Sequence, residues 1–230
     1  RTNQVSGSIY RITLKDQTKL PKPRIDFNNI EGLVDALANP AVNVRSHAAS
    51  QLVARGEKAF GKVNKFLEAN EKEGHLRARA IWVLAQLGDK GLSKVAEYLT
   101  AEDDVEKPLV AYRALRHAEP GGTLDRAKTL AKSKFLSVRR EVAVSLRDVS
   151  YDKCKSVIGD LIDAYDGRNR YFLEALGVAF TNKEEEVYRE LVAPRFPNPE
   201  KWSKTAKRLA WRLHTTDSIR SLDTCIRSQV

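Results

Sequence analysis

A leucine recurs along this chain at an interval of about 30 residues, and this period constrains the fold more than any other feature. The leucines lie at positions 52, 84, 115, 146, 176 and 209, so successive intervals run from 30 to 33 residues. An arginine stands seven positions before three of them, at Arg45, Arg77 and Arg139. Self-similarity at a fixed period of this length is typical of repeat proteins, in which each repeat is one small supersecondary unit.

Each interval contains two segments with the apolar period of a helix, for example "GEKAFGKVNKFLEAN" followed by "HLRARAIWVLAQLG". A pair of amphipathic helices of this length cannot bury both faces alone, whereas stacking on neighbours forms a continuous core. The sequence therefore predicts an all-α fold, an α-α superhelix (a HEAT-like, ARM-type solenoid) of about six helical pairs. The second helix of each pair is the more apolar and should form the inner layer. Gly56 and Gly88 should end helices in the left-handed conformation, and Asp152 should cap the helix after it.

The repeat motif resembles HEAT repeats in their short form, which also occurs in bilin-lyase-like proteins, and the resemblance covers residues 27–230. In such repeats the arginine at the start of the second helix pairs with acidic groups of the adjacent unit. The resemblance therefore implies a structural role for Arg45, Arg77 and Arg139.

The N-terminal segment has a different pattern. In "GSIYRITLK" (7–15), Tyr10, Ile12 and Leu14 alternate with the other residues, which predicts a single β-strand. The next segment, "KDQTKLPKPRID", is interpreted as a linker that its two prolines hold extended. We expect residues 1–26 to be a remnant strand and Pro-rich linker from an upstream domain, and residues 27–230 to be the repeat domain.

Net charge and cysteine content exclude few functional classes of protein. The chain has 40 Lys and Arg against 30 Asp and Glu, a formal net charge of +10, but the basic residues are scattered along it. Solvated helix surfaces are therefore a better interpretation than a nucleic-acid-binding face. No apolar run is long enough to span a membrane. Cys154 and Cys225 form no CxxC motif and are too few for a disulfide scaffold, so we expect free buried thiols.

No motif of known chemistry occurs in the sequence. HExxH, GxSxG, GxGxxG and a phosphate-binding glycine loop are all missing, so we expect no catalytic, cofactor or metal site. "YDGRNRYFLEALG" (165–177) would offer an enzyme the paired carboxylates of Asp166 and Glu174, but a turn followed by a repeat helix is the preferred interpretation. "KWSKTAKRLAWRLH" (201–214) carries the basic face best suited to an acidic partner.

Two of these stretches also carry a resemblance to a larger family. "YDGRNRYFLEALG" and "RLAWRLHTTDSIRSL" resemble the HEAT-repeat region of planctomycete-type membrane-bound dehydrogenase domain proteins, PVC-type haem-binding multidomain proteins. In that family a β-propeller precedes the repeats and a c-type haem domain follows them, and "GSIYRI" resembles the end of the propeller. The resemblance implies a fragment of an exported protein, periplasmic or on the cell surface, whose partners include those two neighbouring domains. It brings no catalytic residue to this chain.

The expected function is therefore that of a non-catalytic scaffold or protein-interaction module. Arginines on the inner helices would offer charge-assisted contacts to the carboxylates of a partner. The candidate partner-binding residues are Arg77, Arg139, Arg170, Arg208 and Arg212. The alternative is a HEAT-like DNA-binding protein of the alkylation-repair glycosylase type, in which Trp82, Trp202 and Trp211 would contact damaged duplex, although no motif of that family aligns with this chain.

Overall fold

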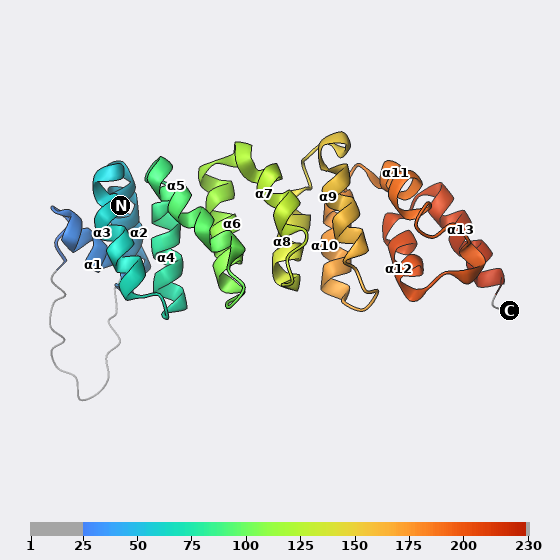
Figure 1. Cartoon of the computed structure of the whole chain (residues 1–230), viewed down its shortest axis with the longest axis horizontal. Helices are drawn as coiled ribbons and strands as arrows, with labels where there is room; N and C mark the ends of the chain where they lie inside the picture. Colours follow the sequence, from blue (N-terminus) through green and yellow to red (C-terminus); the bar gives the residue numbers. More distant parts are fainter. Residues whose placement is uncertain (1–24, 229–230) are drawn as a thin grey trace, which may run out of the picture.

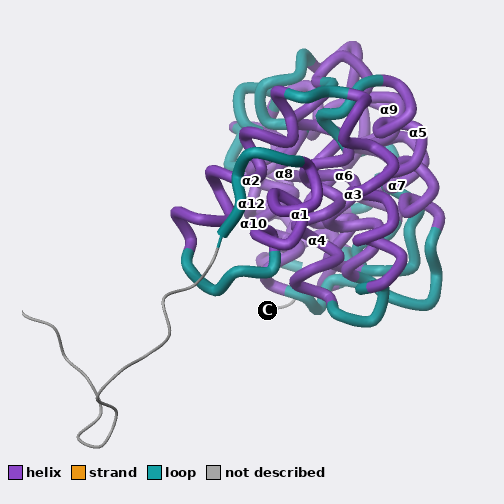
Figure 2. Tube along the Cα trace, turned by 90° about the vertical axis from the view of Figure 1, so that its left-hand side faces the viewer, coloured by secondary structure: helices purple, strands orange, loops and turns teal. Residues whose placement is uncertain are grey.

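The computed structural model describes residues 25–228, and all regular structure within that range is helical. Figure 1 shows the helices side by side in one row, with the two ends of the described chain at opposite ends of the row. Viewed along the row, the helices overlap in a compact outline (Figure 2). The predicted all-α helical-repeat fold is confirmed. The predicted N-terminal strand and nearly all of the predicted linker lie outside the described residues.

The repeats are helix pairs, as the leucine period predicts. The first helices of the pairs are α1 (Ile30–Leu37), α3 (Glu57–Ala69), α5 (Asp89–Ala96), α7 (Thr123–Leu130), α9 (Tyr151–Asp163) and α11 (Glu184–Val187). The second helices are α2 (Val42–Ala54), α4 (Gly74–Leu84), α6 (Glu106–Ala118), α8 (Leu136–Ser145), α10 (Arg170–Phe180) and α12 (Lys204–Leu213). A further helix, α13 (Thr216–Arg227), packs against α12. Each second helix also contacts the second helix of the next pair, so the six form one layer.

Short elements complete the connections between these helices. Three 3-10 turns lie at η1 (Glu97–Thr100), η2 (Pro120–Gly122) and η4 (Pro199–Lys201). The short helix α11 continues as a π-helical turn, η3 (Tyr188–Val192). In π-helical geometry the backbone N–H bonds to the carbonyl five residues back, which lets one extra residue be accommodated in a helix.

The positive φ predicted at two glycines is confirmed, but the predicted cap at Asp152 is wrong. Gly88 does not end α4, which stops at Leu84; it is the N-cap residue of α5. Gly56 has a φ of 58° and Gly88 a φ of 81°, in the region that side chains other than glycine rarely adopt. Asp152 does not cap α9, because the helix begins one residue earlier, at Tyr151, and Asp152 lies in its first turn. A carboxylate there still favours the N-terminal end of the helix dipole.

The recurring leucines form the centre of the core. All six are fully buried: Leu52, Leu84, Leu115, Leu146, Leu176 and Leu209. The apolar core consists of two clusters that meet at α6, where Ala111, Ala114 and Leu115 belong to the N-terminal cluster and Tyr112 to the C-terminal one. Cys154 and Cys225 are buried free thiols, as expected.

Candidate partner-binding face

The second helices share one exposed side, opposite the buried leucines. At 3.6 residues per turn, positions two before, two after and five before each leucine lie on the far side of its helix. We call this side of α2, α4, α6, α8, α10 and α12 the second-helix face. Large apolar side chains are exposed on it: Trp82 at 37%, Val144 at 45%, Tyr171 at 69% and Trp211 at 62% relative exposure. An exposed large apolar side chain is ordinary on its own, but their recurrence on the same side of four helices defines a surface.

Cations surround these side chains, and several are already paired. Arg113 and Arg116 of α6 both bind the carboxylate of Glu141 on α8, at N–O distances of 2.5 Å and 3.0 Å. On α8 the guanidinium of Arg140 lies over the ring of Tyr171, 5.4 Å from its centroid. This geometry is that of a cation–π contact, which here joins one repeat to the next.

Two arginines at the N-terminal end of the row, Arg45 of α2 and Arg79 of α4, have no carboxylate partner among residues 25–228. Arg45 Nη1 donates to the Pro40 carbonyl at 2.6 Å, and Arg79 Nη1 donates to the Leu37 carbonyl at 2.8 Å. Leu37 is the last residue of α1, so both cations gather at the negative end of that helix dipole. Burial, and then the charge of Arg45, lower the pKa of Arg79. The two guanidinium groups are therefore close enough to repel each other.

Arg77, a predicted partner-binding residue, lies inside the structure. The residue is 5% exposed, and its Nη2 binds Asp104 Oδ2 of the next repeat at 2.5 Å and lies 3.6 Å from Glu106 Oε2. Its Nη1 donates to the Glu71 carbonyl at 2.8 Å. We call Arg77, Asp104, Glu106 and the Glu71 backbone the Arg77 joint. Nη2 therefore joins this repeat to the next one, as the HEAT resemblance implies, whereas Nη1 binds a loop of its own repeat.

Arg139 stands at the equivalent position but makes different contacts. Its Nη1 donates to the Ser133 carbonyl at 2.5 Å, and its guanidinium lies 5.7 Å from the centroid of the Phe172 ring. No salt bridge joins it to a carboxylate within the described range, and its buried Nε lacks a hydrogen-bond partner there. A pocket of about 340 Å³ separates repeats at this point, with Asp166 and Arg168 on its wall. We call Arg139, Asp166, Arg168 and the Ser133 backbone the Arg139 joint.

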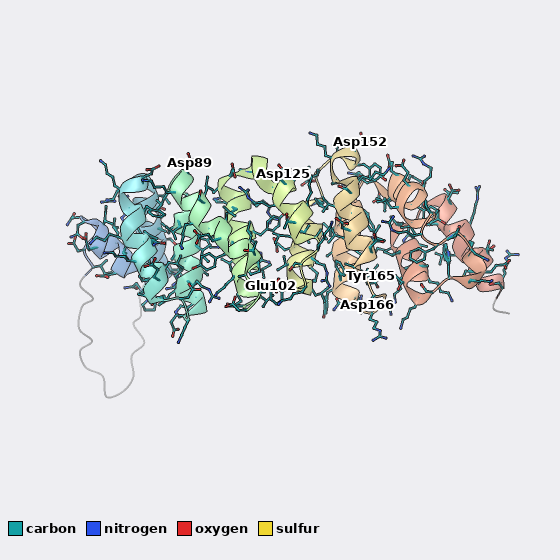
Figure 3. The ribbon with its side chains drawn as sticks, viewed as in Figure 1. Asp89, Glu102, Asp125, Asp152, Tyr165 and Asp166 are labelled. Carbon is teal, nitrogen blue, oxygen red and sulfur yellow. The ribbon has the colours of Figure 1, made fainter. Side chains whose placement is uncertain are left out.

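Acidic residues lie at two opposite edges of the repeat row. Figure 3 shows Asp89, Asp125 and Asp152 at the edge where first helices begin, and Glu102 and Asp166 at the other edge. The second edge holds the loops that connect first helices to second helices, where both joints lie.

The other three predicted arginines differ in how far they reach the surface. Arg208 Nη1 donates to the Gly167 carbonyl at 2.7 Å, so this side chain joins α12 to the preceding loop. Arg212 Nε lies 3.3 Å from Glu174 Oε2, with its guanidinium beside the backbone of Gly177. Arg170 is the most exposed, with a side chain 85% exposed and 3.9 Å from Glu174.

Asp166 and Glu174, the two carboxylates of the enzyme interpretation, have different partners. The backbone N–H of Arg168 donates to Asp166, while the arginines at 170 and 212 lie beside Glu174.

The three tryptophans named for the DNA-binding alternative do not share one environment. Trp202 is 6% exposed and its Nε1 donates to the Phe196 carbonyl at 2.9 Å, so it belongs to the core. Trp82 and Trp211 are exposed on the second-helix face, each beside a histidine: His117 at 5.6 Å and His214 at 4.6 Å between ring centroids. The role proposed for Trp202 in that alternative is therefore wrong, since the ring cannot reach a ligand.

Sequence reasoning did not single out Arg79, Arg140 and Tyr171 as a set. Arg79 and Tyr171 stand five residues before the leucine of the same helix, which would have placed them on the second-helix face; Arg140 stands six before its leucine, next to that position. The sequence alone does not show which arginines form hydrogen bonds or ion pairs with loop residues, because these contacts depend on how the repeats pack together.

Neither a metal cluster nor a membrane-spanning helix was found in the part of the chain that the structure describes. Over residues 25–228, no three His, Cys, Asp or Glu side chains are grouped as they would be to hold a metal ion. Within the same range no helix combines the length and apolar character needed to cross a bilayer.

Comparison with protein-family models and with curated proteins found no match to this chain.

Proposed function

We propose that this chain is a helical-repeat scaffold that binds a partner protein through its second-helix face. The observation that carries the proposal is the row of exposed Trp82, Val144, Tyr171 and Trp211, accompanied by arginines on a rigid layer of helices. Protein interfaces are enriched in Trp, Tyr and Arg, and these residues contribute most of the binding energy. A repeat array offers them on one extended surface.

The same proposal includes the wider setting that the sequence resemblance implies. The chain would be the repeat region of an exported dehydrogenase or c-type haem protein, and its partner would be the neighbouring propeller or haem domain. Support for this part comes from the two stretches at 165–177 and 208–222.

Selection of peptides from a random library displayed on phage would test the proposed binding face. Peptides that bind the whole chain should contain Asp or Glu beside apolar residues. Changing Tyr171→Ala together with Trp211→Ala should weaken their binding by about tenfold or more, as hot-spot truncation does. The matched control is Ile219→Ala with Ile226→Ala, which removes two exposed apolar side chains from α13, outside the face. Equal loss in both variants, or no selected peptide, would contradict the proposal.

The DNA-binding alternative is favoured by one observation, the exposure of Trp82 and Trp211 near cations. Against it, Glu141 and Glu174 each pair with two arginines of this layer of helices, so those cations already have carboxylate partners and are less available to phosphates. Titration with plain and alkylated duplex DNA over a salt series separates the two functions. Preference for the damaged duplex with a steep salt dependence would favour the alternative, because phosphate contacts release counterions.

A further inference from the structure

The groove between α2 and α4 combines charge and apolar surface in a way that the rest of the face does not. It encloses about 270 Å³, and its wall includes Arg45, Arg79 and Trp82. Its floor is apolar, from Leu37, Ala49 and Val83. The groove has room for about two or three side chains of a ligand, and its cations are Arg45 and Arg79.

The two arginines of this groove retain unused donors. Each guanidinium has five N–H groups, and in each of these arginines only Nη1 has a hydrogen-bond partner among the described residues. By contrast, Arg113 and Arg116 share the carboxylate of Glu141, and Arg77 is paired with Asp104. Lys204 and Lys207 of α12 also lack a carboxylate partner among residues 25–228, but at Arg45 and Arg79 the unused donors line a groove with an apolar floor.

We propose that the α2–α4 groove binds an acidic side chain of the partner protein, with the carboxylate between Arg45 and Arg79 and an adjacent apolar residue against Trp82. This inference rests on the proposed function and identifies the chemistry that the face recognises. A carboxylate placed there would receive charge-assisted hydrogen bonds from both arginines and would relieve the repulsion between them. The apolar floor explains why a protein segment fits better than a nucleic acid, which would bring a second phosphate over Leu37 and Val83.

The rim of the groove is consistent with an extended peptide. Ser46 is exposed beside Arg45, and its hydroxyl has no partner within residues 25–228. Gln86 uses its amide nitrogen on the Trp82 carbonyl at 2.8 Å, which leaves its amide oxygen able to accept from a peptide N–H. Trp82 has one ring face near His117 and 37% of its surface exposed to a ligand.

Fluorescence anisotropy with a designed peptide tests this site. The probe is a dye-labelled peptide with a Glu-Leu-Glu core in Gly and Ser flanks, and its Gln-Leu-Gln counterpart is the neutral comparison. The whole chain should bind the acidic peptide at least about tenfold more tightly than the neutral one, because two charge-assisted contacts are lost with the charge. Equal binding of the two peptides would overturn the inference.

Substitutions then separate the groove from general charge. Arg45→Gln with Arg79→Gln should weaken binding of the acidic peptide by about tenfold or more, whereas Lys58→Gln with Lys65→Gln should change it by less than about twofold. The control removes the same charge from exposed positions of α3. If both pairs weaken binding equally, attraction is non-specific and the inference fails.

A third variant still tests the inference if the double arginine substitution unfolds the chain. Ser46→Glu leaves both arginines in place and supplies a carboxylate from the rim, so it should block the acidic peptide without loss of helical content. Undiminished binding in Ser46→Glu would overturn the inference. If library-selected peptides still depend on Tyr171 and Trp211 while ignoring all groove variants, this inference fails and the proposed function stands.

Discussion

The Arg77 joint and the Arg139 joint occupy the same place in their repeats, yet one is a buried ion pair and the other is open. In each, an arginine near the start of a second helix binds the carbonyl of the residue six positions before it. An aspartate follows 27 residues later in both, at Asp104 and Asp166. Arg77 Nη2 lies 2.5 Å from Asp104 Oδ2. Arg139 and Asp166 form no such pair and instead line a pocket of about 340 Å³.

The residue two positions after the aspartate accounts for much of the difference. At the Arg77 joint it is Glu106, which adds a second carboxylate near the guanidinium. At the Arg139 joint it is Arg168, a second cation on the wall of the pocket. The loop with Arg168 is held instead by Arg208, which binds the Gly167 carbonyl from α12. The loop after Arg77 therefore supplies two carboxylates, whereas the loop after Arg139 supplies one carboxylate and one cation.

Removing each arginine should produce the largest contrast between the joints. Arg77→Ala leaves Asp104 without its buried partner and should lower the free energy of unfolding by about 3 kcal/mol, the lower end for breaking a buried pair. Arg139→Ala loses one hydrogen bond and the contact with Phe172, and should cost about 1 kcal/mol. Urea denaturation of both variants measures the difference. Equal losses would show that the buried ion pair is not what distinguishes the joints.

A substitution at Gly167 should displace the loop of the Arg139 joint. Its φ is 72°, and a Cβ built there would lie 2.3 Å from Thr205 Oγ1 of α12. Gly167→Ala should therefore cost about 2 kcal/mol, of which about half comes from the left-handed backbone. At Gly121 a Cβ would meet nothing within 4 Å, so Gly121→Ala should change stability by less than about 0.5 kcal/mol. A Tm series on the two variants decides whether the loop is docked as described.

A charge change should make the open joint resemble the closed one. Arg168→Glu places a second carboxylate beside Arg139 and should stabilise the chain by about 0.5 kcal/mol, within the range of exposed pairs. The reverse change, Glu106→Arg, puts a cation near Arg77 and should destabilise by about the same amount. Destabilisation by Arg168→Glu would contradict the idea that the charge at position 168 keeps this joint open.

The smallest predicted effect is on the titration of Asp166. The backbone N–H of Arg168 donates to Asp166 Oδ1 at 2.9 Å and lowers the pKa of this carboxyl below its ordinary value. Its contribution to stability is therefore present above the unfolded pKa of about 3.9 and is lost as pH falls through the lower folded value. Carbon NMR of the side chain should show the depressed pKa and its rise in Arg168→Glu. An ordinary pKa in the unchanged chain would contradict the hydrogen bond.

Much of the fold could be predicted because it depends on local pattern. Leu52 and Leu209, 157 positions apart in the printed sequence, are both fully buried since each repeats the same helical register. Gly56 and Gly88 could be placed because few other residues adopt a positive φ. The strand predicted at 7–15 stays a prediction, because it lies outside the described residues.

The candidate face could be predicted only in part because it depends on contacts between repeats. Arg77 and Arg79 are two positions apart in the sequence. Arg77 is buried and paired with Asp104, whereas Arg79 lines a groove together with Arg45. Trp202 and Trp211 lie in the same basic stretch, yet a loop carbonyl at Phe196 holds the first in the core and the second is 62% exposed. Composition and spacing within one repeat contain no such information.

Hydrogen exchange on the whole chain, with and without the Glu-Leu-Glu peptide, tests the central claim most directly. Binding to the second-helix face should slow exchange in α2 and α4 and leave the first helices α3 and α5 unchanged. Slowed exchange in α3 and α5, or none anywhere at peptide saturation, would contradict the account.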